Sequence, residues 1–96
     1  MSAYWISVYR ETTDDDKVKA YAALAFPALT EAGGTFVARG FPEQVYEAGE
    51  PTRTVVIRFD SVEAAVAAHD APAYQEALAA LDGGAIRDLR IVPGVD

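Results

Sequence analysis

Residues 53–81 read RTVVIRFDSVEAAVAAHDAPAYQEALAAL, and this stretch decides the fold. Its first seven residues predict a β-strand, because Val55, Ile57 and Phe59 alternate along it with Thr54, Val56 and Arg58. Ser61 is placed to cap an alanine-rich helix that carries Glu63 in its first turn. The helix breaks at Asp70–Pro72 and restarts, since proline suits the first turn of a helix. A strand followed by a broken helix predicts one βα unit of an α+β domain.

The residues before this stretch predict a second unit of the same kind. A strand is expected over Ala3–Tyr9. A helix follows, capped by Thr13 and three consecutive aspartates and running to about Ala32, with a kink expected at Pro27. Gly33 and Gly34 end it, and the next strand spans 35–40.

The remaining segments complete a β-α-β-β-α-β order in one domain, residues 1–96. An edge run is expected at Gln44–Glu47, a turn at Ala48–Pro51 and the last strand at Ile86–Val92. This order predicts the ferredoxin-like α+β class, a four-stranded antiparallel sheet with both helices on one face.

Strand alternation then assigns side chains to the two sheet faces. The expected helix-facing set is Ile6, Val8, Phe36, Ala38, Val55, Ile57, Leu89 and Ile91. The expected opposite face carries Trp5, Ser7, Tyr9, Val37, Arg39, Val56, Arg58, Arg90 and Val92. That face is too apolar to remain in water, so we predict a homodimer through it, with Trp5, Ser7, Arg39, Val56, Arg58 and Arg90 in the interface.

Composition restricts the classes of function. The chain has 96 residues, a net charge of −7 and no cysteine, so disulfides and thiolate catalysis are excluded. The acidic balance argues against a nucleic-acid partner. Short apolar stretches and the N-terminal sequence predict neither a membrane span nor a signal peptide, hence a cytoplasmic protein. With one histidine, neither a metal nor a haem cofactor is expected.

Several motifs resemble one known family along essentially the whole chain. They are AYW near the start, AGG followed by Arg39 and Gly40, VYEAG, RTVVIRFDSVEAAVAAHDAPAYQEAL and the closing RIVPGV. They are similar to the family named domain of unknown function 1330, in the dimeric α/β-barrel superfamily. The sequence departs from the family pattern at Ala71, where a capping serine is frequent, and at Asp82–Gly84, where many relatives carry an arginine. Asp70 is expected to supply the missing cap.

The resemblance implies a ferredoxin-like fold and face-to-face dimerisation but no settled activity. The superfamily includes cofactor-free monooxygenases, lactone isomerases, haem-dependent chlorite-degrading enzymes and ligand-sensing domains, so a function taken from it would rest on fold analogy.

The candidate site lies between the first helix and the sheet. A kink at Pro27 would open a small apolar cavity, which we expect Trp5, Tyr9, Tyr21 and Phe26 to line, with Asp70 as a further ligand-binding residue. His69, beside Asp70, is the candidate general base. A histidine near a helix C-terminus also has a purely structural explanation in the helix dipole.

Two explanations are open for the arginines. Arg39, Arg58 and Arg90 can bind a carboxylate or phosphate, or can pair with acidic groups such as Glu47 and Asp88 in a dimer. We favour pairing, and interpret Arg53 and Arg87 as ordinary surface charges.

The function hypothesis is a cofactor-independent enzyme or a binder for a small aromatic or anionic metabolite, the alternative being a non-catalytic ligand-sensing or structural dimer.

Overall fold

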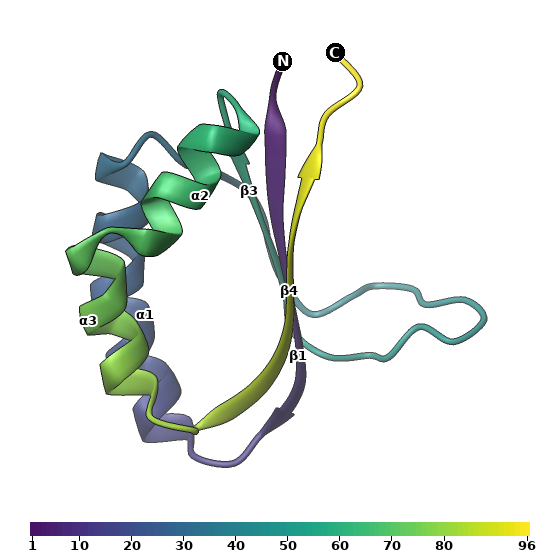
Figure 1. Ribbon diagram of the computed structural model, residues 1–96. Helices are drawn as coiled ribbons and strands as arrows, with labels where there is room; N and C mark the ends of the chain where they lie inside the picture. The colour runs from purple at the N-terminus through teal and green to yellow at the C-terminus, as the bar shows by residue number, and fades with distance from the viewer.

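The computed structural model describes all residues from Met1 to Asp96 and has two layers (Figure 1). The elements are β1 (Ala3–Thr12), α1 (Asp15–Glu31), β2 (Thr35–Gly40), β3 (Thr54–Phe59), α2 (Val62–Asp70), α3 (Pro72–Leu81) and β4 (Ala85–Pro93). The four strands form one sheet in the order β2-β3-β1-β4, with every neighbouring pair antiparallel. All three helices cover one face (Figure 1). The predicted ferredoxin-like α+β class is confirmed.

Helix α1 begins at a capping residue as predicted, but the cap lies one residue later than expected. Asp14, and not Thr13, caps α1, because its carboxylate accepts the backbone N–H groups of Asp16 and Lys17 at 3.0 and 3.1 Å. The Thr13 hydroxyl instead donates to the Gly83 carbonyl at 3.0 Å. Helix α1 continues without a break through Pro27.

The predicted break between α2 and α3 is confirmed. Ser61 accepts the N–H of Ala64 at 3.0 Å, Ala71 is extended, and Pro72 opens α3. The expected cap from Asp70 is wrong, because α3 has no side-chain cap and the Asp70 carboxylate lies 3.0 Å from Nδ1 of His69 instead.

The predicted faces of β1 are wrong. Trp5, Ser7 and Tyr9 are buried on the helix side, at 1, 2 and 5% exposure, whereas Ile6 and Val8 are only half-buried on the other side. The register explains the result. Trp5 pairs with Ile57 and Ile91, residues correctly predicted to face the helices, so Trp5 must share their face.

A β-bulge in β2 overturns a second prediction. The pairing shifts between Phe36, opposite Ile57, and Ala38, opposite Val56. Residues after the bulge change face, so Arg39 pairs with helix-facing Val55 and Ala38 turns away from the helices. Arg39 therefore does not lie on the face where we expected a dimer contact.

The β2–β3 connection contains no strand. The expected edge run at Gln44–Glu47 is wrong, since residues 41–53 form a loop with a turn closed by the Gly49 N–H on the Tyr46 carbonyl at 2.9 Å. The loop projects from the sheet on the side away from the helices (Figure 1), and leaves Phe41 69% and Tyr46 77% exposed.

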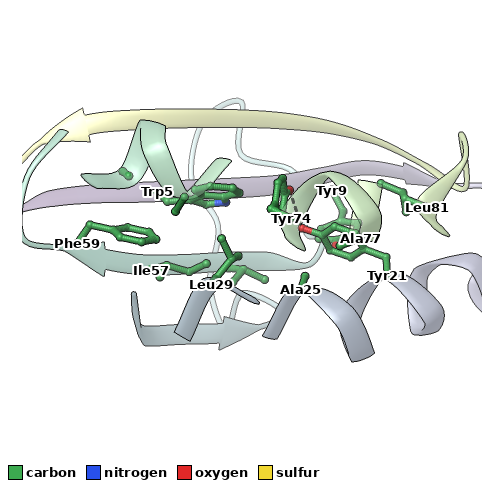
Figure 2. Close-up of a cluster of buried hydrophobic side chains, with 13 residues drawn as sticks. Trp5, Tyr9, Tyr21, Ala25, Leu29, Ile57, Phe59, Tyr74, Ala77 and Leu81 are labelled. Carbon is green, nitrogen blue, oxygen red and sulfur yellow. Dashed lines mark hydrogen bonds between the residues drawn. The ribbon is translucent and has the colours of Figure 1, made fainter. Parts of the chain in front are cut away.

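The hydrophobic core fills the space between helices and sheet (Figure 2). Trp5 is its centre, and its ring packs edge-on against Tyr74 with centroids 5.0 Å apart. Close approach of the turn between α1 and β2 to β3 depends on Gly34. A Cβ atom there would lie 2.9 Å from the Ile57 and Phe59 side chains, tighter than van der Waals contact allows.

Candidate functional site

A cleft between α1 and the sheet forms the candidate site. It has a cavity of about 40 Å³, lined by Trp5, Ser7, Tyr9, Tyr21, Ala22, Ala25, Phe26, Leu29, Phe36, Arg39, Arg53, Val55, Ile57 and Arg87. It adjoins a wider outer groove of about 490 Å³ that shares Tyr9, Ala22 and Arg53 with it. The inner cavity admits water, and the outer groove has the size of a small-molecule site.

Three rows of side chains across the sheet form the floor of the cleft. The first row contains Phe36, Ile57 and Trp5, the second Arg39, Val55 and Ser7, and the third Arg53, Tyr9 and Arg87. The cleft is therefore apolar at the first row and cationic at the third, where it meets the outer groove.

Two arginines bracket Tyr9 in the third row. The guanidinium carbon of Arg53 lies 6.0 Å from the centroid of the Tyr9 ring, and that of Arg87 lies 5.5 Å from it. Both are within reach of cation–π attraction. The ring thus separates two cations at the junction of cleft and groove.

Arg87 is also held by two tyrosines of the helical layer. It donates to the Tyr21 hydroxyl at 2.9 Å and to the Tyr74 hydroxyl at 3.4 Å, and these two hydroxyls lie 2.8 Å apart. Burial raises the pKa of Tyr21 well above its usual value, with Tyr74 adding to the rise and Arg87 opposing it. Tyr21 therefore remains a neutral phenol, and the charge of Arg87 is not neutralised by it.

Arg39 lies at the exposed edge of the cleft. Its guanidinium carbon is 5.4 Å from the Phe26 ring centroid and 5.5 Å from that of Phe36, and these two rings are 5.0 Å apart. Phe26 is 46% exposed. This wall of the cleft can move at little cost, because its side chains are not part of the buried core.

None of these three arginines has an acidic partner. The ion pairs of the chain are Arg10–Asp88, Arg90–Asp88, Arg58–Asp96, Lys17–Asp82 and His69–Asp70. Arg39, Arg53 and Arg87 are absent from them, and no carboxylate lines the inner cleft. Arg53 and Arg87 are partly buried, whereas Arg39 is exposed, and partly buried cations without counter-charge favour an anion in the cleft.

Two buried side-chain oxygens lie along the cleft and the groove that adjoins it. Ser7 Oγ and Thr52 Oγ1 have no hydrogen-bond partner within the protein. Ser7 lines the inner cleft and Thr52 the outer groove. Buried hydroxyls are normally satisfied, so these two are free to bond a group that enters the cleft.

The structure brings together some of the predicted site residues. Trp5, Tyr9, Tyr21 and Phe26 line the cleft as expected. His69 and Asp70 do not line it; the His69 ring packs against the Trp5 and Tyr74 rings, at centroid distances of 5.8 and 5.3 Å.

Arg53 and Arg87 were wrongly interpreted as surface charges. The signal that could have identified them is strand alternation. Arg87 shares its parity with Leu89 and Ile91, and Arg53 shares it with Val55 and Ile57. Both arginines therefore follow the helix-facing pattern already recognised in those strands.

Two of the predicted arginines do lie on the face away from the helices. Arg90 donates to Asp88 through two nitrogens, each at 2.8 Å, and these bonds hold the pKa of Asp88 at about 2. Arg58 donates to the Ser2 hydroxyl at 2.7 Å, 3.8 Å from Asp96. The pairing of Arg90 with Asp88 thus occurs within one chain.

The fold and the cleft define a ferredoxin-like α+β domain with a cationic, partly aromatic cleft between helix and sheet. A model of the family described as a domain of unknown function (DUF1330) matches residues 2–95, and the chain belongs to this family. No curated protein matches the chain. No helix is both long and apolar enough to cross a membrane.

Solved structures share the fold at low sequence identity. A protein of unknown function from Rhodopseudomonas palustris superposes with a TM-score of 0.77 at 17% identity, over 99% of this chain and 83% of that one. A dimeric ferredoxin-like protein of unknown function from Jannaschia superposes with a TM-score of 0.76 at 15% identity, over 98% of this chain and 100% of that one. SnoaB, a cofactor-independent oxygenase from Streptomyces nogalater, superposes with a TM-score of 0.67 at 12% identity, over 99% of this chain and 94% of that one.

Proposed function

We propose that the protein binds a small anionic metabolite with an aromatic or apolar body in the cleft between α1 and the sheet. The observation that carries the proposal is the group Arg39, Arg53 and Arg87, which surrounds an otherwise mainly apolar cleft without any acidic partner. Arginine is suited to planar anions because its guanidinium donates two parallel hydrogen bonds to a carboxylate.

Binding accounts for the cleft better than acid–base catalysis does. No histidine, aspartate or glutamate lines the inner cleft, and the only histidine of the chain packs against Trp5 and Tyr74 outside it. A general base must reach the proton it removes, directly or through one water. The lining residues supply charge recognition and apolar contact, which a ligand-binding or sensing module needs.

Binding is testable with the intrinsic fluorescence of Trp5, the only tryptophan and a lining residue. Titration with benzoate is expected to change the emission and saturate. Benzamide, a neutral molecule of the same shape, is expected to bind at least about tenfold more weakly, because it cannot balance the guanidinium charges. Equal affinities for the two, or no saturable change with benzoate, would contradict the proposal.

We also propose that the protein is a homodimer through the open face, meaning the sheet face turned away from the helices. The open face carries Tyr4, Ile6, Val8, Val56, Arg58, Asp88, Arg90 and Val92. Its aliphatic centre, Ile6 opposite Val56, is only half-buried in the single chain, and Val92 is 41% exposed. A second open face would cover this patch.

The variant Val56→Glu tests the dimer. A carboxylate at the centre of the proposed interface would lose its water without a partner, so we expect the dissociation constant to rise about 100-fold or more. Sedimentation velocity measures this, with circular dichroism to show that the fold is retained. Val66→Glu makes the same change at an exposed position of α2 and should leave association unaltered. A wild-type protein that sediments as a monomer at micromolar concentration would refute the dimer.

A further inference from the structure

Ser7 gives the cleft a second polar contact, one row deeper than the arginine pair. Its side chain is 2% exposed, its Oγ has no partner in the protein, and it lines the inner cleft between the apolar first row and the cationic third row. A buried hydroxyl in this state costs stability, and the cost is removed when a ligand atom bonds to it.

The spacing of the rows sets the distance between the two polar contacts. Ser7 and Tyr9 are two residues apart on β1, so the second and third rows are separated by about 7 Å. Arg53 and Arg87 flank Tyr9 in the third row. Because the contacts belong to neighbouring rows of the floor, a ligand that meets both carries an anion at one end and a hydrogen-bonding oxygen at the other, at a separation on the order of the row spacing of about 7 Å.

The wall between these contacts is suited to a flat ring. Trp5, Tyr9, Tyr21 and Phe26 contribute aromatic surface to the cleft. The cavity of about 40 Å³ must widen to take a ring. The exposed Phe26 and Arg39 side chains are the part of the wall that can move aside.

We infer that the ligand is a hydroxy-substituted aromatic carboxylic acid, with the carboxylate at Arg53 and Arg87 and the ring hydroxyl at Ser7. A benzene ring with the two groups at opposite ends spans about the distance between the rows. This inference rests on the proposed function, because it assumes that the cleft binds an anion.

Isothermal titration calorimetry of wild type and Ser7→Ala with benzoate, 3-hydroxybenzoate and 4-hydroxybenzoate tests the inference. Wild type is expected to bind 4-hydroxybenzoate about tenfold more tightly than benzoate, with 3-hydroxybenzoate closer to benzoate. In Ser7→Ala the affinity ratio between 4-hydroxybenzoate and benzoate should fall below about twofold. Thermal melting is the check on folding, and Ser7→Ala should melt no lower than wild type because it removes an unsatisfied hydroxyl.

The outcomes separate this inference from the proposed function. If benzoate and 4-hydroxybenzoate bind equally to wild type, or if the preference survives in Ser7→Ala, the role of Ser7 is refuted and the anion site stands. If the Ser7 hydroxyl bonds only to water while the acids bind, benzoate and 4-hydroxybenzoate should bind equally to wild type. If none of the acids binds, both proposals fail.

Discussion

Replacing Arg87 by glutamine is expected to weaken the binding of benzoate about 30- to 100-fold. Arg87 is a partly buried cation of the cleft, with its guanidinium carbon 4.6 Å from the Tyr21 ring centroid and its nitrogens donating to two neutral hydroxyls. A hydrogen bond between a charged donor and a carboxylate contributes about 1.5–3 kcal/mol in such surroundings. Glutamine keeps an N–H donor near Tyr21 and Tyr74 but removes the charge.

Arg90→Gln is the matched control for this variant. It makes the same chemical change three residues further along β4, on the open face, where Arg90 is paired with Asp88. Its effect on benzoate affinity should stay below about twofold, because solvent screens an exposed charge on the far side of the sheet. If both variants lose affinity equally, the protein attracts anions through its overall field and the cleft has no specific role. Unchanged binding in Arg87→Gln would remove Arg87 from the site.

The order of elements could be predicted because the chain marks most element ends locally. Ser61 and Pro72 act on their own helix turns, and the glycines after α1 and α3 stop those two helices, so no knowledge of the rest of the fold is needed. The cap of α1 was missed by one residue, because Thr13 and Asp14 are both good caps and a tertiary bond to Gly83 occupies the threonine hydroxyl.

The faces of β1 could not be read from the strand itself. Both alternating sets are largely apolar, Tyr4, Ile6 and Val8 on one side and Trp5, Ser7 and Tyr9 on the other, so alternation defines the sets without saying which one faces the helices. The serine and two polar-tipped rings suggested an outer face. The structure places them inside because Trp5 packs against Phe59, His69 and Tyr74.

The candidate site could be predicted only in part, because its lining also depends on which face of each strand turns toward the helices. The cleft and its α1 residues Tyr21 and Phe26 follow from the position of α1 over the sheet. The contributions of Trp5 and Tyr9, and the cationic end, depend on which strand faces turn toward the helices. Arg39 joins it only because a bulge in β2 changes its face, and β-bulges have no reliable mark in a single sequence. The three arginines expected together are thereby divided, with Arg58 and Arg90 paired to carboxylates on or beside the open face and Arg39 in the cleft.

Replacing Trp5 by alanine is expected to lower the free energy of unfolding by about 3–5 kcal/mol. The side chain is 1% exposed, and its ring contacts Phe59, His69 and Tyr74 at centroid distances of 6.2, 5.8 and 5.0 Å. The surrounding rings belong to the sheet and to two helices, so they cannot collapse into the space that is left. Urea denaturation followed by circular dichroism measures the loss, since the variant has no tryptophan fluorescence.

Tyr4→Ala is the decisive comparison, because Tyr4 is the neighbouring residue on β1 and lies on the open face. If the helices cover the Trp5 face, Tyr4→Ala should cost less than about 1 kcal/mol in the single chain and should act mainly on dimer dissociation. Unfolding measured at several protein concentrations separates the two contributions, because only the loss of association depends on concentration. A reversed pattern, with Trp5→Ala affecting association and Tyr4→Ala unfolding the chain, would restore the face assignment read from the sequence and place the cationic cleft on the wrong side of the sheet.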